Sequence, residues 1–248
     1  MPRGRLQITL LLALTVCGGV LLNAQSVLET VQSGNVQAVA KILRKSTARI
    51  NEQDGRGITP LILATLANDS AMVELLMRYR PDPDIQAEGG MTALHAAAFH
   101  GRDRCSPMII ALRANPNILD ARGRSPLHVA ARQGHTNVVT QLCDAGAAID
   151  FRDRDGNSAL MVACGNRHLG TLEELLEKGA FIHTRDLRGR TPLMLLAVLG
   201  EDEMMRIMLR YKPELELVDH SGLTALTYAK INRRKTIIRI LEAAGAKF

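Results

Sequence analysis

The chain has 248 residues, of which 46% are hydrophobic but only 3% aromatic, and it contains no tryptophan. A single globular core of this size normally includes large aromatic side chains, whereas thin stacked layers can be filled with Ala, Leu, Val and Ile. The low aromatic content therefore argues against one aromatic-rich core. The charged content of 23% is average, and the formal net charge of +6 indicates a moderately basic protein.

Residues 1–24 have the pattern of a secretory signal peptide. Arg3 and Arg5 give a basic start, residues 6–22 are almost entirely apolar or small, and Ala24 ends a tolerable cleavage site. Cleavage after Ala24 is the favoured interpretation. It predicts an exported protein, either periplasmic in a bacterium or secreted.

Two alternatives for this leader stay open. Residues 6–22 could remain as a membrane anchor, although Gly18 and Gly19 make the run weak for a span of about 20 residues. The stretch Leu14-Thr15-Val16-Cys17 also resembles a bacterial lipoprotein processing box, which would place a lipid on Cys17, although Val16 is larger than the usual Gly or Ala.

Beyond the leader, one short pattern returns at a fixed interval of 33 residues. Its fullest copy is Gly123-Arg124-Ser125-Pro126-Leu127-His128-Val129-Ala130-Ala131. A period of this length held without slippage indicates stacked supersecondary units. In each copy a Ser or Thr stands two residues after a glycine and two before a leucine, at Thr59, Thr92, Ser125, Ser158, Thr191 and Thr224.

Elementary helix chemistry explains the start of each unit. Ser125 can cap a first helix with its hydroxyl group, and Pro126 then sits in the first turn, where no backbone donor is needed. Thr191 and Pro192 repeat this arrangement. We expect Gly134 to end the helix in a left-handed conformation.

The second half of the unit follows the same logic. A second helix is expected to open at residues 135–137, to turn Val138 and Leu142 inward, and to close at Gly146. The following stretch, Asp153-Arg154-Asp155-Gly156, predicts a turn, because glycine tolerates the conformation that such a turn requires.

The Ser-Pro-Leu-His-x-Ala sequence and the 33-residue period together resemble the ankyrin repeat, and the resemblance covers residues 25–248. It implies an all-α repeat solenoid, an elongated curved array in which each unit is two antiparallel helices followed by a β-hairpin finger. The expected divisions are an N-terminal cap at 25–58, full repeats at 59–91, 92–124, 125–157, 158–190 and 191–223, and a C-terminal capping repeat at 224–248.

The repeat at 92–124 is the predicted weak joint of the array. Pro107 lies where its second helix should continue, and proline cannot donate a backbone hydrogen bond there. We therefore expect a shortened helix with Ser106 as its cap and Pro107 in its first turn. Arg113 also replaces the closing glycine.

The basic run of the C-terminal repeat suits a terminal unit with one solvated face. This run, which includes Arg233, Arg234, Lys235 and Arg239, could instead bind an anionic surface. The polar cap is the favoured interpretation.

Three cysteines remain after the predicted cleavage, Cys105, Cys143 and Cys164, and each falls on a position that the repeat reserves for an apolar residue. We expect small buried hydrophobic residues there and no disulfide framework. The histidines give no metal site either, because most of them occupy regular repeat positions and the two exceptions, His100 and His220, lie more than three repeats apart.

No catalytic motif stands out. The sequence has no Cys-x-x-Cys, no phosphate-binding glycine loop and no serine in a strained strand-to-helix turn. The acidic runs Glu173-Glu174 and Glu201-Asp202-Glu203 are expected to face solvent on second helices. We therefore predict a non-enzymatic protein without cofactor or metal.

In ankyrin proteins, partners are usually held by the finger tips and by the concave ends of the first helices. At the corresponding positions this chain concentrates arginine, flanked by apolar residues, a combination that suits carboxylates or phosphates beside an interface core. The candidate partner-binding residues are Phe99, His100, Arg122, Arg124, Arg132, Gln133, Arg154, Arg188, Arg190, Val198 and Leu199.

The sequence thus predicts a monomeric interaction module whose concave surface binds another protein through an acidic and partly apolar segment. The alternative is electrostatic binding of a polyanion or an anionic membrane surface. Nucleic acid is not expected, because the aromatic residues that stack on bases are missing. Contact with a membrane is expected only if the N-terminal segment is retained. The simplest alternative is that the finger arginines only keep the tips solvated and bind no partner.

Overall fold

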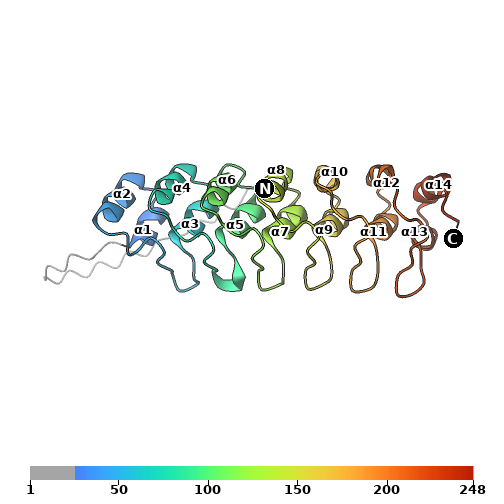
Figure 1. The fold of residues 1–248 in the computed structure, drawn as a ribbon, viewed down its shortest axis with the longest axis horizontal. Coiled ribbons are helices and arrows are strands. Elements are labelled where there is room, and N and C mark those ends of the chain that lie inside the picture. The colour runs from blue at the N-terminus through green and yellow to red at the C-terminus, as the bar shows by residue number, and fades with distance from the viewer. Residues whose placement is uncertain (1–25, 248) are drawn as a thin grey trace, which may run out of the picture.

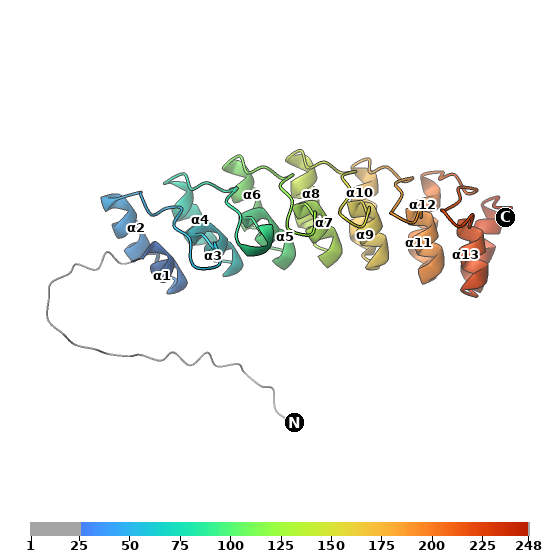
Figure 2. The same cartoon turned by 90° about the horizontal axis from the view of Figure 1, so that it is seen from below.

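The computed structural model describes residues 26–247. The predicted leader, with its cleavage, anchor and lipidation alternatives, lies outside the described residues. Helices follow one another in antiparallel pairs, and the pairs stack side by side into an elongated, gently bent array (Figures 1 and 2). Within 26–247, no helix is long and apolar enough to cross a membrane. The predicted all-α repeat array is confirmed.

The helices form two rows (Figure 1). The first helices of the pairs lie beside the loops that project from the array, which we call fingers, and the second helices form the outer row. The first helices are α1 (Val27–Gln32), α3 (Pro60–Leu66), α5 (Ala93–His100), α7 (Pro126–Gln133), α9 (Ala159–Gly165), α11 (Pro192–Leu199) and α13 (Ala225–Ile231). The outer helices are α2 (Val36–Lys45), α4 (Ser70–Met77), α6 (Cys105–Ala111), α8 (Thr136–Asp144), α10 (Leu169–Glu177), α12 (Asp202–Arg210) and α14 (Lys235–Ala243).

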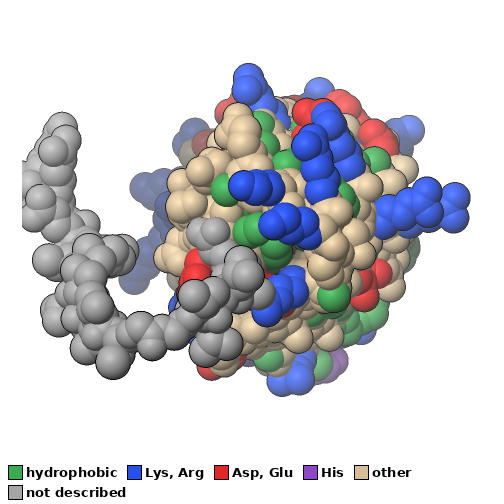
Figure 3. All heavy atoms as spheres, turned by 90° about the vertical axis from the view of Figure 1, so that its left-hand side faces the viewer, with side chains coloured by type: hydrophobic (Ala, Val, Ile, Leu, Met, Phe, Trp, Pro, Cys, Tyr) green, Lys and Arg blue, Asp and Glu red, His purple; other side chains and the backbone are tan. Residues whose placement is uncertain are grey.

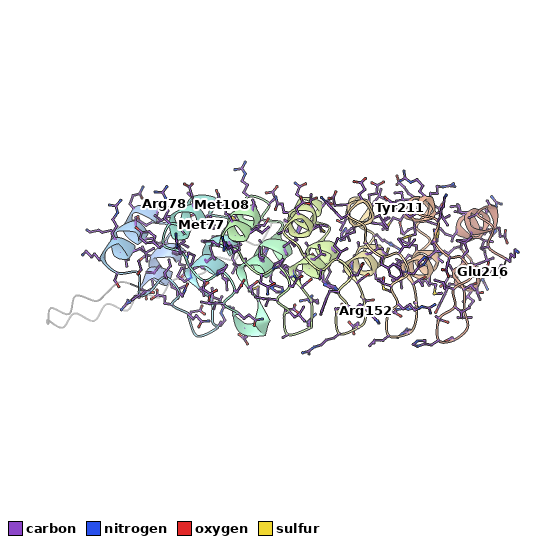
Figure 4. All side chains as sticks on the ribbon, in the orientation of Figure 1. Met77, Arg78, Met108, Arg152, Tyr211 and Glu216 are labelled. Carbon is purple, nitrogen blue, oxygen red and sulfur yellow. The ribbon has the colours of Figure 1, made fainter. Side chains whose placement is uncertain are left out.

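Thin apolar layers between neighbouring pairs replace a central core. Ala96, Ala97 and Ala98 of α5 are fully buried, and such small side chains let adjacent helices approach closely. In the outer row, Met77 and Met108 pack against this core from consecutive repeats (Figure 4).

The predicted helix caps are borne out at Thr191 but not at Ser125. The hydroxyl of Thr191 accepts a hydrogen bond from the backbone N–H of Met194 at 3.4 Å. Ser125 makes no such cap bond. Its Oγ lies 2.8 Å from Nδ1 of His128 in the first turn. Pro126 does occupy the first turn, as expected.

Left-handed residues recur at the helix ends. Gly134 has a φ of 75°, as predicted. Arg167 occupies the same place one repeat later with a φ of 63°, and Arg113 and Lys212 end outer helices with φ values of 65° and 52°. A cation beside the C-terminal end of a helix is favoured by the helix dipole, which offsets part of the strain of a left-handed side chain.

The outcome at Pro107 is mixed. Helix α6 is short, with 7 residues, and Pro107 lies in its first turn. Ser106 is not the cap, because the helix already begins at Cys105. The Ser106 side chain is buried, and its hydroxyl donates to the side-chain oxygen of Gln141 on α8.

Two of the three described cysteines are small buried residues, as expected. Cys105 and Cys164 are fully buried and Cys143 is half-buried, and all three are free thiols. Burial raises the pKa of the Cys143 thiol to about 11 and raises the pKa of the other two as well. These thiols are therefore protonated and unreactive near neutral pH.

Several kinds of side-chain hydrogen bond tie a repeat to its neighbour, among them three that recur. In the first, a residue that opens an outer helix donates to the last turn of the first helix of the preceding repeat, as His168 Nε2 does to the Arg132 carbonyl of α7 at 2.9 Å. In the second, a side-chain oxygen accepts a backbone N–H of the next repeat, as Glu216 does from Lys247 at 2.8 Å near the C-terminal end (Figure 4). In the third, His95 Nε2 donates to the Arg124 carbonyl at 3.0 Å.

None of these three bonds forms between the repeats at 158–190 and 191–223, as far as the described residues go. Glu201 stands where four other repeats have a donor, Arg102, His135, His168 or Arg234. His183 stands where other repeats have an Asn, Asp or Glu, and Met161 where two repeats have histidine. Glu201 instead pairs with Arg167 at 2.9 Å, and both side chains are partly exposed. We call this interface the ion-paired junction.

The predicted weak joint at 92–124 keeps cross-repeat bonds on both sides. Arg102 donates to the Leu66 carbonyl at 3.1 Å, and Asn117 accepts from the backbone N–H of Ala148 at 2.7 Å. The ion-paired junction also has cross-repeat bonds, since Arg185 donates to the Val218 carbonyl at 2.7 Å and Arg210 pairs with Glu173 at 3.3 Å. What it lacks is the three recurring bonds.

Replacing His183 with asparagine should install the missing oxygen acceptor at this junction. We expect His183→Asn to raise the free energy of unfolding by about 1 kcal/mol, the usual net value of a hydrogen bond. Asn117→His, the reverse change at an intact interface, should lower it by a similar amount. Urea unfolding measures both variants, and an unchanged His183→Asn protein beside a destabilised Asn117→His protein would contradict this account.

Histidine burial predicts a second, pH-dependent effect. Burial lowers the pKa of His95 and His128 below the usual 6.5, so below that pH the unfolded chain binds protons that the folded chain does not. The free energy of unfolding should therefore fall as the pH drops from about 7.5 to 5.5, by up to about 1.4 kcal/mol per pH unit for each histidine. Thermal unfolding of His95→Gln/His128→Gln should show a flatter pH dependence, whereas the exposed-site control His220→Gln should keep the full slope.

Candidate functional site

A hollow of about 520 Å³ lies where the fingers face the first helices near the middle of the array. Helices α3, α5 and α7 provide one wall, and the fingers at 87–91 and 120–124 provide the other. We call this hollow the concave pocket. It is lined by Leu66, Gly89, Met91, His95, Phe99, His100, Asp120, Ala121, Arg122, Arg124, Val129 and Arg132.

Five of the candidate partner-binding residues meet in this pocket. They are Phe99, His100, Arg122, Arg124 and Arg132. The sequence spacing alone placed them on different elements, and the fold brings the end of α5, the end of α7 and one finger tip together.

The remaining candidates lie further along the array and do not line the concave pocket. Arg154 and Arg188 are exposed on the next two fingers, and Arg190 is half-buried in its finger. Gln133 ends α7 and is half-buried. Val198 and Leu199, at the end of α11, are also half-buried.

The fingers are tight turns built around an aspartate. In the described residues, the expected β-hairpins contain no regular strand, only an isolated bridge between Ala87 and Met91 beside the short 3-10 helix η1 (Glu88–Gly90). In the finger at 120–124, the Asp120 Oδ1 atom accepts the backbone N–H groups of Arg122 at 2.8 Å and Arg124 at 2.9 Å. One carboxylate thereby fixes the whole tip.

The same aspartate neutralises one of the candidate arginines. Arg124 Nε donates to Asp120 Oδ2 at 2.8 Å, and its second nitrogen lies 2.6 Å from the same oxygen. Burial raises the pKa of Asp120, but the hydrogen bonds from Arg124 and from the backbone outweigh this effect, so the pKa lies below its usual value. Arg190 and Asp186 repeat the arrangement in a later finger.

The candidate arginines therefore fall into two groups. Arg124 and Arg190 are paired within their own fingers and shape the tips. Arg122 and Arg132 are exposed at the concave pocket, and neither side chain has an ion-pair partner within residues 26–247. Their charge is available to a ligand.

Apolar and imidazole groups complete the pocket. The Phe99 side chain is 48% exposed, and its ring packs edge-on against His100 with centroids 4.9 Å apart. Burial lowers the pKa of His100, and the nearby charges of Arg102 and His135 lower it further. His100 is therefore a neutral hydrogen-bonding group near pH 7, and it lines the same pocket as the unpaired cations Arg122 and Arg132.

Sequence reasoning missed the finger aspartates. Five of the six finger turns carry one, at Asp54, Asp120, Asp153, Asp186 and Asp219, and their Oδ1 atoms make the same pair of backbone bonds. Alignment on the 33-residue period would have found them, because each stands five residues before the Ser or Thr of its repeat. Only Ala87 breaks the series.

The acidic runs are less solvated than expected. Glu173 and Glu201 are half-buried and pair with Arg210 at 3.3 Å and Arg167 at 2.9 Å. A larger hollow of about 650 Å³ lies near Glu173, between α10, α12 and α14. It is away from every candidate residue, and its charged lining is already partly paired. No group of three or more potential metal ligands occurs among residues 26–247.

Comparison with known proteins gives the family. A family model described as ankyrin repeats, in three copies, matches residues 28–118, 105–186 and 181–248. A search of curated proteins found no match. The chain belongs to the ankyrin-repeat family, whose members are protein–protein interaction modules and are typically non-enzymatic.

Removing the Asp120 carboxylate should loosen the finger at the pocket. We expect Asp120→Ala to lower the free energy of unfolding by about 2 kcal/mol, because two backbone donors and the Arg124 guanidinium lose their acceptor. Asp155→Ala, at an exposed carboxylate on the next finger, is the matched control and should change little. Thermal unfolding compares the two, and equal stability of both variants would contradict a structural role for Asp120.

Proposed function

We propose that the concave pocket binds a segment of a partner protein that presents an acidic side chain beside an apolar one. The unpaired charge at the pocket carries this proposal. The side chains of Arg122 and Arg132 suit a carboxylate ligand, because a planar guanidinium donates two parallel hydrogen bonds to such a group.

The structure of the finger supports this proposal because it distinguishes the arginine that is paired within the finger from those that are free to contact a ligand. Asp120 pairs with Arg124 through contacts of 2.6 and 2.8 Å. The attraction for an anion therefore comes from the two remaining arginines. Since the finger backbone is fixed by hydrogen bonds, little ordering of the tip is needed on binding.

The apolar half of the site supports a protein ligand over a simple anion. Phe99 is 48% exposed at the end of α5, and Leu66, Met91 and Val129 line the same pocket. Aromatic anchors and arginine are the residues most enriched in the energetic centres of protein interfaces. A bound apolar side chain would cover Phe99 while a neighbouring carboxylate meets the arginines.

Charge reversal at the two unpaired arginines tests the proposal. Affinity capture from the native compartment, read by mass spectrometry, should give a partner whose recovery falls about tenfold or more with Arg122→Glu/Arg132→Glu. The control Arg104→Glu/Arg206→Glu changes the same charge at exposed positions of the outer row and should leave recovery unchanged. Equal capture by the pocket variant, with unaltered thermal unfolding, would overturn the site.

We also propose that the protein is exported, as the basic and apolar leader indicates. Intact-mass measurement of the native protein should then give a chain that begins near Gln25. A full-length mass would favour a retained anchor, and a lipid-sized increment on a chain starting at Cys17 would favour a lipoprotein.

A further inference from the structure

The C-terminal repeat has the most one-sided charge of any repeat. Residues 224–248 contain one acid, Glu242, against Lys230, Arg233, Arg234, Lys235, Arg239 and Lys247. All of these side chains are exposed. A terminal repeat needs a polar outer face, but mixed charges would meet that need equally well.

Elsewhere in the array, many cations have structural partners. Lys178 pairs with Asp144 at 2.6 Å, and Arg210 pairs with Glu173 at 3.3 Å. Among the cations of residues 224–247, the structure gives such a role to Arg234, whose Nε donates to the Val198 carbonyl at 3.0 Å.

The other cations of this end are uncompensated. Lys230, Arg233, Lys235 and Arg239 have no acidic side chain within ion-pair distance among residues 26–247. Lys235 and Arg239 stand four residues apart on α14, a spacing at which like charges repel. The end is therefore charged beyond what the fold requires.

An exposed apolar residue stands among these cations in the sequence. Ile231 is 61% exposed at the end of α13, between Lys230 and the turn that contains Arg233. Its counterpart one repeat earlier, Val198, is half-buried and adjoins Arg234 of the following repeat. Ile231 therefore presents an apolar side chain to solvent close to these cations in the sequence.

We propose that this end of the array docks on a membrane surface that contains anionic phospholipid. We define the C-terminal basic surface as Lys230, Ile231, Arg233, Lys235 and Arg239. Cations are drawn to the negative potential of such a membrane, and an exposed aliphatic side chain enters the boundary between headgroups and acyl chains. A nucleic acid would use the charge but would leave Ile231 without a role.

Docking through the end leaves the concave pocket free. The pocket lies near α5 and α7 in the middle of the array, whereas the C-terminal basic surface lies on α13 and α14 (Figure 1). One protein can therefore hold a membrane at its end and a partner on its concave face. This inference does not depend on the proposed partner site.

Vesicle binding of the full chain tests the proposal. Flotation with vesicles of phosphatidylserine and phosphatidylcholine should recover the wild-type protein, and pure phosphatidylcholine vesicles should not. The triple variant Lys230→Glu/Lys235→Glu/Arg239→Glu should lose about tenfold or more in binding. Ile231→Ser should weaken binding severalfold at unchanged charge.

The opposite end of the array offers a matched control. It also carries exposed Lys and Arg side chains (Figure 3), among them Lys41, Arg44 and Lys45 of α2, but no large exposed apolar residue precedes Phe99 in the described chain. Lys41→Glu/Arg44→Glu/Lys45→Glu should retain vesicle binding, with thermal unfolding confirming that all variants fold.

Three outcomes would overturn the proposal. Equal loss in the α2 control would show that net charge alone is responsible. Unchanged binding of the C-terminal triple variant would exclude this surface. Unchanged vesicle binding of Ile231→Ser, together with wild-type binding to heparin or RNA of comparable strength, would indicate a general polyanion site instead of a membrane surface.

Discussion

Stacking of each repeat on its neighbours is the interaction on which the whole array depends, because one helix pair cannot bury its own apolar face. The buried alanines of α5 allow this close stacking. Side-chain hydrogen bonds then fix each repeat against the next, as those of His95 and His168 do. Stability is therefore distributed along the chain and can differ from one interface to the next.

The finger aspartates connect this scaffold to function. By accepting two backbone N–H groups, Asp120 sets the shape of its tip and at the same time neutralises Arg124. The arginines without such a partner, Arg122 and Arg132, retain their attraction for anions. Counting arginines along the sequence therefore overstates the charge available for binding, and only the geometry of each finger separates the two groups.

The period of 33 residues was sufficient to predict the architecture, the place of Pro126 and the left-handed Gly134. It did not predict which atom a small hydroxyl would contact. Ser125 contacts the His128 ring and makes no cap bond, and the buried Ser106 hydroxyl donates to Gln141. Periodicity fixes backbone position, whereas such contacts depend on side-chain rotamers and on the neighbouring repeat. Five of the eleven candidate residues line the concave pocket and six do not, and the sequence did not predict how ion pairing divides the arginines.

The ion-paired junction lies between the two surfaces that carry the proposals. The concave pocket is built from repeats that precede it, and the C-terminal basic surface belongs to the end that follows it. Apolar packing continues across the junction, with Leu160 and Leu193 both buried, while its partly exposed ion pair is sensitive to salt in a way that buried hydrogen bonds are not. The junction also keeps the bond from Arg185 to the Val218 carbonyl at 2.7 Å, so salt should weaken only the ion-paired part of the contact between the repeats that hold the two surfaces.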